Sequence, residues 1–405
     1  MFGNIELYNE MSEDSCIYIE DYIKNIDYCP LSMFQEGFSI KNEIQNEGKK
    51  FKVIPTIQLA KVDDAEEIAD IVNSVYRGTY PYKEFCDKNE IEKMIKDDRY
   101  YFILFKVKDE IAGFYNAQLN FKKRKGYFGG LVLKEKFHGK IDLLKSAMVS
   151  VSSIYYTFKD KIYIWYGETR TSHSKSQYIV VKCGIKPIAF FPNKDIFLNA
   201  VESDLLHIIY NKKAIEDFRS KEIPKLIPQV SDCFLYATSR YNLGPVIFKN
   251  PIIHLNSEIY SNIRKKIIIK SESNKFGYEW VNMFNRDTDS YFKFLLTRHL
   301  FNIEKMEYKI KCLEELVAFI HELKELMKRK YIRYCECFVS AYKPEHQKIF
   351  YLEGFKPRGY VPSWFYDENN NIFEDAVVFN LFKGKLDNNL KLVPEGEELV
   401  RIFKV

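Results

Sequence analysis

The sequence predicts an α/β protein with a mixed (α+β) sheet, built twice along one chain. Three observations lead to this fold class. A chain of 405 residues is too long for one ordinary core, so two domains are expected. Short apolar runs alternate with stretches of helical spacing, in the order β-α-α-β-β-β-α-β-α-β over the first half. A nine-residue motif beginning at Gly184 returns at Gly354, together with the elements around it.

The first half can be followed element by element. The strands are expected at 56–59, 101–106, 111–119, 126–133, 162–166 and 204–210, and the helices at 65–75, 90–95, 141–158 and 175–182. Asp63 or Asp64 is placed to cap the first helix, which has an apolar face. Because hairpin turns and crossover helices both occur, the sheet is expected to contain antiparallel and parallel pairs.

The repeat consists of GIKPIAFFP at 184–192 and GFKPRGYVP at 354–362, at an offset of 170 (354 − 184). Gly, Lys, Pro, an aromatic residue and Pro occupy the same five places in both copies. The same offset aligns the strand 162–166 with 332–336 and the helix from Ile141 with a helix at 313–327. The closing strand at 202–210 meets 374–382 at an offset of 172 (374 − 202). Chance would not align all of these elements, so the chain is predicted to contain two copies of one fold.

Domain boundaries follow from the repeat. The expected parts are an N-terminal extension at 1–53, a first domain at 54–211, a helical connector at 212–240, a second domain at 241–385 and a C-terminal tail at 386–405. Pro224 and Pro228 are expected to end the helix of the connector. Within the second domain, strand-like runs occur at 246–248, 252–255 and 266–269.

Composition excludes several classes of protein. An apolar share of 46% with 29% charged residues is typical of a globular chain. A net charge of +5, from 61 basic and 56 acidic residues, gives no indication of a nucleic-acid partner. Cys335 and Cys337 have no second ligand pair nearby, so no metal site is expected, and the eight cysteines suit a reducing compartment. Without a leader pattern or a run of about 18 apolar residues, the protein is expected to be cytoplasmic, with no membrane partner.

The stretch at 129–148, GGLVLKEKFHGKIDLLKSAM, joins a short apolar strand to a helix through a basic loop that contains a glycine. Two interpretations are open. The free N–H groups and the dipole of the helix N-terminus would suit an anion there, held by His138, Gly139, Lys140, Ile141 and Asp142. The stretch would otherwise be an ordinary strand–helix connection with a solvated basic loop.

With its flanking segments, this order of elements resembles the GCN5-related N-acetyltransferase (GNAT) superfamily, whose loop motif is Arg/Gln-x-x-Gly-x-Gly/Ala. HSKSQYIVVKCGIKP at 173–187 looks like the N-x-x-A-x-x-x-Tyr-x-x-x-Gly-Phe segment of that family, and RGTYPY and DEIAGF also look like parts of its members. The resemblance covers about three quarters of the chain if both copies count. It implies two tandem GNAT-like domains and an N-acyltransferase that uses acetyl-CoA or another acyl-CoA as co-substrate. The implied acceptor is an amine of a small molecule or a peptide.

The sequence departs from the pattern of the family at several positions. Ile141 and Leu143 stand where small residues normally let the phosphates approach, and His173 stands in place of the usual Asn. Val180 replaces the Tyr that is thought to protonate the leaving thiolate, and Tyr178 lies two residues earlier. In the second copy, no glycine precedes the helix and Phe350 occupies the Tyr position, so the second domain is expected to be degenerate.

The chemistry of acyl transfer assigns roles to particular residues. The backbone of Leu131, Val132 and Leu133 is the candidate for holding the pantetheine and for donating an N–H to the developing oxyanion. The candidate bases are Glu168, which follows the strand at 162–166, and His173; Tyr178 is the candidate acid. Each of these three side chains would otherwise be a solvated strand end, a loop residue or a helix-packing residue.

Two other functions stay open. Because both copies depart from the family motif, the chain would also suit a non-catalytic binding or regulatory protein that retains the fold. It would also suit an acyltransferase that takes its acyl group from a carrier other than CoA, such as an aminoacyl-tRNA.

Overall fold

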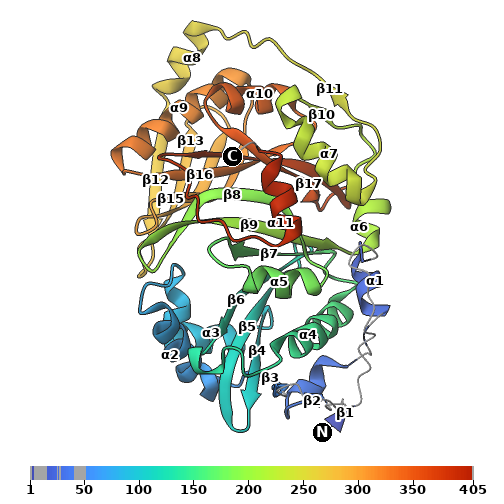
Figure 1. Ribbon diagram of the computed structural model, residues 1–405. Coiled ribbons are helices and arrows are strands. Elements are labelled where there is room, and N and C mark those ends of the chain that lie inside the picture. Colours follow the sequence, from blue (N-terminus) through green and yellow to red (C-terminus); the bar gives the residue numbers. More distant parts are fainter. Residues whose placement is uncertain (1, 4–15, 25, 27–28, 41–51, 404–405) are drawn as a thin grey trace.

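A computed structural model describes residues 2–3, 16–24, 26, 29–40 and 52–403 (Figure 1). The rest of the expected extension and of the expected tail lies outside these residues. The fold is a mixed α/β fold around a sheet of 14 strands, mostly antiparallel, so the predicted fold class is confirmed. The two copies of the fold are visible as the lower and upper parts of Figure 1.

The first copy follows the predicted order with one strand added. Its strands are β3 (Thr56–Leu59), β4 (Tyr100–Val107), β5 (Glu110–Asn120), β6 (Lys125–Leu133), β7 (Ile164–Arg170), β8 (Lys186–Phe197) and β9 (Ala200–Tyr210), and its helices are α2 (Ala65–Tyr76), α3 (Lys88–Lys96), α4 (Leu143–Phe158) and α5 (Lys175–Lys182). The added strand is β8, which contains the repeated motif. Almost every residue of β8 is buried, so its sequence lacks the alternation that marks a half-exposed strand.

The second copy has the same order of strands, but α8 (Ser257–Arg264) precedes its first strand, and the described residues between its first two strands form no helix. Its strands are β12 (Ile267–Ser273), β13 (Tyr278–Asn285), β14 (Tyr291–Thr297), β15 (Asn302–Lys309), β16 (Tyr334–Ser340), β17 (Lys356–Asp367) and β18 (Ile372–Phe382), and its helices include α8, α9 (Leu313–Arg329) and α10 (Pro344–Leu352). The strand predicted at 252–255 is wrong, because those residues are irregular. The run at 246–248 forms only the two-residue β11 (Ile247–Phe248), which pairs with β10 (Lys225–Leu226) outside the main sheet.

The remaining elements are short. They are β1 (Phe2–Gly3), β2 (Ser39–Ile40), α1 (Ile19–Lys24), α6 (Lys212–Glu216), α7 (Ser231–Tyr241), α11 (Pro394–Arg401) and the single-turn 3₁₀ helices Leu31–Phe34, Val62–Asp64, Lys83–Cys86, Glu135–Phe137 and Pro228–Val230. They cover the edges and faces of the two copies rather than extend the main sheet.

The sheet has an internal twofold arrangement. Its strand order is β12-β13-β14-β15-β16-β18-β17-β8-β9-β7-β6-β5-β4-β3, so the two copies run in mirrored order from the centre outwards. They meet where Gly359 of β17 pairs with Ala189 of β8. These two residues are equivalent positions of the repeat (359 − 189 = 170), as expected for a contact that lies on a twofold axis. One hydrophobic core continues across this junction, from β8 and β9 into the second copy.

The segment that follows each copy crosses over and packs on the other copy. After β9, helix α7 packs on β17 of the second copy, and after β18, helix α11 packs on β8 of the first copy. A further sequence repeat marks both crossings, KLIPQ at 225–229 and KLVPE at 391–395, at an offset of 166 (391 − 225). In the part that the structure describes, the expected C-terminal tail therefore packs on the first copy.

Two buried glutamines at equivalent places hold these crossing segments. In the first copy, Gln177 Nε2 donates to the carbonyl of Lys391 at 3.0 Å, and its Oε1 accepts from the N–H of Val393 at 3.1 Å. In the second copy, Gln347 makes the matching bonds to Lys225 and Ile227, both at 3.1 Å. Each copy thus depends on a segment that belongs, in sequence, to the end of the other.

Candidate active site

Strands β6 and β7 run parallel at first and then diverge. They pair only between 125–128 and 164–167, so the second half of β6 has no partner on that side. The divergence begins at a bulge in the pairing of β5 with β6, where Gly130 has a φ of +63°. A Cβ at this position would lie 2.9 Å from Asn116 Nδ2, which donates to the carbonyl of Gly129 at 2.8 Å. Glycine therefore allows the bend that opens the sheet.

A pocket of about 150 Å³ passes through this opening from one face of the sheet to the other. On the face covered by α4 and α5, its walls are mainly apolar. On the face covered by α2, its walls carry aromatic and acidic side chains. The apolar residues include Ala147, Val151, Ile179, Val180 and Ile185; the others include Tyr76, Tyr80, Tyr82, Tyr127, Glu168, Asp195 and Asp204. The passage therefore has an apolar end and an acidic, aromatic end.

The two predicted bases both line this pocket. Glu168 lies near the end of β7, where both of its carboxylate oxygens accept from Lys194 Nζ, at 2.8 and 2.9 Å. His173 lies in the turn before α5, and its Nδ1 is buried without a hydrogen-bond partner. Burial, with Arg170 nearby, lowers the pKa of His173 below its usual value. His173 is therefore neutral at pH 7 and able to accept a proton.

Tyr178, the predicted acid, does not lie at the pocket. Its side chain is 48% exposed on the outer side of α5, with Lys182 near its ring. Ser176, Ile179 and Val180, which share one side of this helix, are its positions that line the pocket. Val180 thus occupies the place where the family would have its tyrosine, and an apolar side chain cannot supply a proton.

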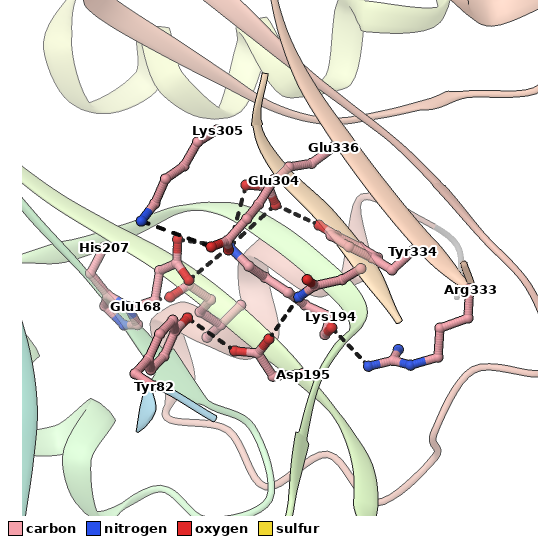
Figure 2. A network of polar contacts seen from close by, with 12 residues as sticks. Tyr82, Glu168, Lys194, Asp195, His207, Glu304, Lys305, Arg333, Tyr334 and Glu336 are labelled. Carbon is pink, nitrogen blue, oxygen red and sulfur yellow. Dashed lines mark hydrogen bonds and ion pairs between the residues drawn. The ribbon is translucent and has the colours of Figure 1, made fainter. Parts of the chain in front are cut away.

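The sequence interpretation missed the centre of the acidic end, which is Lys194 (Figure 2). Its side chain is 1% exposed, and Nζ lies 2.8 Å from Glu168, 3.2 Å from Glu336 and 3.8 Å from Glu304. Glu304 and Glu336 belong to β15 and β16 of the second copy, so both copies build this cluster. The only signal in the sequence is a charged pair, Lys194 and Asp195, that follows the apolar run at 187–192 within one strand.

Asp195 and Asp204 complete the cluster. Tyr82 Oη donates to Asp195 at 3.3 Å, and Asn302 Nδ2 donates to it at 3.2 Å (Figure 2). Asp204 lies on the neighbouring strand, β9, and its Oδ1 has no hydrogen-bond partner. All of these carboxylates are almost completely buried, which disfavours their charged forms.

Burial sets the pKa values of this cluster. It raises the pKa of Asp195 to about 7 and that of Glu336 to about 7, although Lys194 opposes both shifts. Burial, followed by repulsion from Asp195 and Glu168, raises the pKa of Asp204 well above its usual value. Burial acts against the charge on Lys194, but the surrounding glutamates hold its pKa well above the usual value. The cluster therefore holds more carboxylates than its cations can neutralise.

The stabilisation that Asp195 and Glu336 contribute is expected to fall as pH rises from 5 to 8. The folded-state pKa values of Asp195 and Glu336 lie above those of the unfolded chain, so the folded state binds these protons more tightly. The stabilisation is complete below the unfolded values, near pH 4, and is lost as pH rises through about 7. Thermal unfolding of the ligand-free protein, followed by circular dichroism at fixed ionic strength, measures this change.

Asp195→Asn is the matched variant for this measurement. Its melting temperature is expected to fall less, or rise more, between pH 5 and 8 than that of the unmodified protein, because one of the two groups no longer titrates. An equal dependence of the melting temperature on pH in both proteins would contradict the assignment.

The predicted anion loop is only partly available. Helix α4 begins at Leu143 rather than at Ile141, because Ile141 forms a bridge with Val53. The N–H of Val53 donates to the carbonyl of Lys140 at 3.3 Å, and the N–H of Asp142 donates to the carbonyl of Val53 at 2.8 Å. The carboxylate of Asp142 then caps the helix by accepting from the N–H of Lys145. One backbone donor predicted for an anion is thus used within the chain, and the cap carries negative charge.

The other residues predicted for cofactor binding lie at several places. Leu131 lines the pocket, Val132 is buried, and the carbonyl of Leu133 accepts from His138 Nε2 at 3.2 Å. Gly139 makes the turn with a φ of +72°. Of the residues predicted to bind the cofactor, Leu131 therefore lines the pocket, and the others lie farther along the chain, at the end of β6 and in the loop that leads to α4.

Two loop cations point away from the helix N-terminus. Lys134 Nζ lies 2.8 Å from Glu67 and 3.0 Å from Glu110, and Lys136 Nζ donates to Glu110 at 2.7 Å. Lys140, beside Gly139, is exposed and is the loop cation that could meet an anion. The exposed Lys140 thus suits the interpretation as an anion site, whereas the paired Lys134 and Lys136 suit an ordinary strand–helix connection.

In the second copy, side chains fill the corresponding opening. Strands β15 and β16 pair only at Asn302 with Tyr334 and at Ile303 with Cys335. The buried ring of Tyr308 packs against Phe350, and its Oη bonds His346 Nδ1 at 3.1 Å. Burial lowers the pKa of His346 to about 4, so this histidine is neutral.

The helix N-terminus of the second copy is also occupied. Glu315, in the first turn of α9, accepts from the N–H of Lys311 at 2.9 Å. It also accepts from Asn285 Nδ2 at 2.8 Å and from Thr288 Oγ1 at 2.7 Å. A carboxylate of the chain itself therefore occupies the place where an anion would bind.

Comparison with known proteins gives matches among solved structures. No family model matches the sequence, and no curated protein is similar to it. A microcin self-immunity acetyltransferase, MccE, in complex with acetyl-CoA and AMP is 16% identical over 38% of this chain and 92% of its own, with a TM-score of 0.32. A variant of the spermidine N-acetyltransferase SpeG from Vibrio cholerae is 15% identical over 39% and 94%, with a TM-score of 0.33. A protein described as a probable acetyltransferase is 14% identical over 39% and 93%, with a TM-score of 0.32.

The order of elements on which the resemblance to the GNAT superfamily rests is present in the first copy, with β8 added. Each copy has a helix between two diverging parallel strands (α4 or α9), a second helix after them (α5 or α10) and a final hairpin, whereas α2 and α3 between the first two strands occur in the first copy alone. The chain thus has a tandem GNAT-like fold. None of the helices in the described part of the chain is long and apolar enough to cross a membrane.

Proposed function

We propose that the protein is an N-acyltransferase that works through its first copy, with acyl-CoA as the acyl donor. The observation that carries this proposal is the passage through the sheet at Gly130, with Glu168 and His173 on its wall. The apolar end would take the pantetheine arm and the acyl group, and the acidic end would take the amine. The second copy would not bind a donor, because Tyr308 and Glu315 occupy the equivalent places.

The donor would supply an activated acyl group. The residues of the chain would orient the thioester and the amine and would accept the proton of the amine. The backbone at 129–131, which lines the pocket without a partner on the β7 side, would orient the thioester carbonyl. Neutral His173 would accept the proton of the attacking amine, and Glu168, fixed by Lys194, would orient that amine. The C–N bond forms as the C–S bond breaks, and the thiolate takes up a proton from water, since Val180 cannot donate one.

Acetyl-CoA is expected to raise the melting temperature by several degrees at millimolar concentration, because it would bind only the folded protein. Lys140→Ala is expected to weaken this effect, while Lys265→Ala, an exposed lysine of the second copy, should not. Release of free thiol with a panel of amines measures turnover. Glu168→Gln should keep the acetyl-CoA effect but lower turnover by about 100-fold. If acetyl-CoA does not stabilise the unmodified protein and no amine causes release of thiol, the proposal is refuted.

One observation favours a second candidate, an acyltransferase with a different carrier. Val53 covers part of the loop where the pyrophosphate of CoA would lie. If S-acetyl-pantetheine stabilises the protein as well as acetyl-CoA does, the loop contributes nothing to donor binding, and a carrier without that phosphate contact is favoured. Val53→Pro removes the N–H that bonds the carbonyl of Lys140 and so weakens the bridge whose other bond occupies the N–H of Asp142. The variant should strengthen binding of acetyl-CoA but not of S-acetyl-pantetheine.

A further inference from the structure

Asp204 is a buried carboxylate that faces the pocket without a partner for Oδ1. It is 2% exposed and lies on the wall of the acidic end. Leaving a buried polar atom unpaired costs free energy, and a charged one costs more. Such an atom on the wall of a pocket indicates that a ligand supplies the missing donor.

The charges around Asp204 lead to the same conclusion. Five almost completely buried or partly buried carboxylates surround the site: Glu168, Asp195, Asp204, Glu304 and Glu336. The cations within the cluster are Lys194 and the partly buried Arg333, with Lys305 reaching Glu304 from the surface at 3.9 Å. Arg170 also lines the pocket, but its guanidinium is paired with a further carboxylate, Glu202. At least two negative charges have no cation when all five groups are ionised. Either protons or a cationic ligand must neutralise them.

The groups still available suit an ammonium rather than a metal ion. Lys194 Nζ already occupies the centre of the three glutamates, which leaves Asp195 and Asp204. Among the described residues, no group of three or more His, Cys, Asp or Glu side chains is arranged to hold a metal. An ammonium group has three N–H donors and needs fewer carboxylates than a metal does.

The walls beside these carboxylates are aromatic. The rings of Tyr76 and Tyr80 lie 4.5 Å apart, and those of Tyr80 and Tyr82 lie 5.8 Å apart. Tyr82 lies next to Asp195, to which its Oη donates. Aromatic faces attract an organic cation and pack against the methylene groups that carry it.

We infer that Asp195 and Asp204 bind a second, non-reacting ammonium group of the acceptor, so that the acceptor is a diamine or a longer polyamine. This inference rests on the proposed function, since one amine must still reach the acyl donor beside Glu168 and His173. The second copy contributes to the same site, because Glu304 and Glu336 hold Lys194 in place and Asn302 bonds Asp195.

The test compares 1,4-diaminobutane with butylamine, each added to the full chain without an acyl donor. The diamine is expected to raise the melting temperature by several degrees at a concentration where butylamine and an equal ionic strength of NaCl have no effect. Equal effects of the diamine and butylamine, or no effect of the diamine, would overturn the inference. An effect of MgCl₂ equal to that of the diamine would overturn it too, because the site would then select divalent charge.

Asp204→Asn separates binding from folding. The variant is expected to weaken diamine affinity about tenfold or more, because one partner of a buried charge pair is lost. Its melting temperature without ligand should not fall, because a buried carboxyl with an unpaired oxygen and acidic neighbours is replaced by a neutral amide. Glu272→Gln, at an exposed position of β12, is the matched control and should change neither value. A variant that loses stability and keeps its affinity would show that Asp204 has only a structural role.

The outcomes also distinguish this inference from the proposed function. Diamine binding without any acyl transfer would refute the proposed enzyme and leave the cation site. Acyl transfer to butylamine as fast as to 1,4-diaminobutane, at equal low concentration, would support the enzyme and refute the second ammonium subsite.

Discussion

Replacing Lys194 with methionine is expected to lower the free energy of unfolding by about 3–5 kcal/mol at pH 8. Lys194 is the only cation within 4 Å of both Glu168 and Glu336 in the described part of the chain. Methionine would fill a similar volume but leave buried glutamates without their charge partner. Urea denaturation followed by circular dichroism would measure the change.

The loss should be smaller at pH 5.5 than at pH 8. Burial already raises the pKa of Glu336 to about 7, and removing Lys194 would raise it further, so the carboxyl is neutral at the lower pH. Lys305→Met is the control, because this lysine is 61% exposed and lies 3.9 Å from Glu304. That variant should change stability by no more than about 0.5 kcal/mol. If Lys194→Met costs no more than the control at pH 8, the cluster is not charged as described.

Adding Glu336→Gln to Lys194→Met should restore part of the loss. The double variant contains one fewer buried carboxylate, so its cost should be lower than that of Lys194→Met alone. This would also show that the two copies are coupled through the cluster, because Lys194 and Glu336 lie in different copies.

The fold was predictable from the sequence because its signals are local or repeated. The helix at 65–75 has an apolar face, and the repeated GxKP motif placed each copy relative to the other. What the sequence did not reveal was β8, whose buried residues do not alternate, and the crossing of the chain after each copy. The KLIPQ and KLVPE segments do repeat in the sequence, but their offset of 166 differs from the 170 of the main repeat, since 391 − 225 = 166.

The candidate site was predictable only where function follows from position on one element. Glu168 was predicted to lie at the opening of the sheet because it follows the predicted strand at 162–166, although β7 itself continues to Arg170, and His173 was predicted from a family motif; both line the pocket. The helical spacing of α5 would have excluded Tyr178, because the buried Gln177 and Val181 fix which side faces inwards.

The acidic cluster could not be found in this way. Lys194 and Glu336 are 142 residues apart, and only the twofold arrangement of the sheet brings them together. The contact of Val53 with the loop was equally hidden in the sequence. Val53 was assigned to the extension, and its carbonyl accepts from the N–H of Asp142, a backbone donor that was predicted to bind an anion. Long-range pairings of this kind depend on the final register of strands, which no local pattern records.

Gly359→Ala is the second change with a large expected effect, because Gly359 lies where the two copies meet. A Cβ there would lie 2.4 Å from the Cβ of Ala189 and 2.7 Å from the carbonyl oxygen of Ile188. The backbone of Gly359 does not have a positive φ, so the cost would be steric and would come from pushing β8 and β17 apart. We expect a loss of about 1–3 kcal/mol, measured by urea denaturation.

Ala189→Gly is the matched partner in a double-mutant cycle. Alone it should cost about 0.5–1 kcal/mol, as glycine does within a strand. Combined with Gly359→Ala it removes the closest of three clashes and leaves those with the carbonyl oxygen of Ile188 and the Cα of residue 189, so the double variant should be more stable than the sum of the single losses predicts, by about 0.5 kcal/mol or more. Strictly additive losses would mean that β8 and β17 do not meet at these residues. Because the contact at Ile188 persists, full recovery is not expected, and the part that is recovered measures how closely the two copies pack on their common axis.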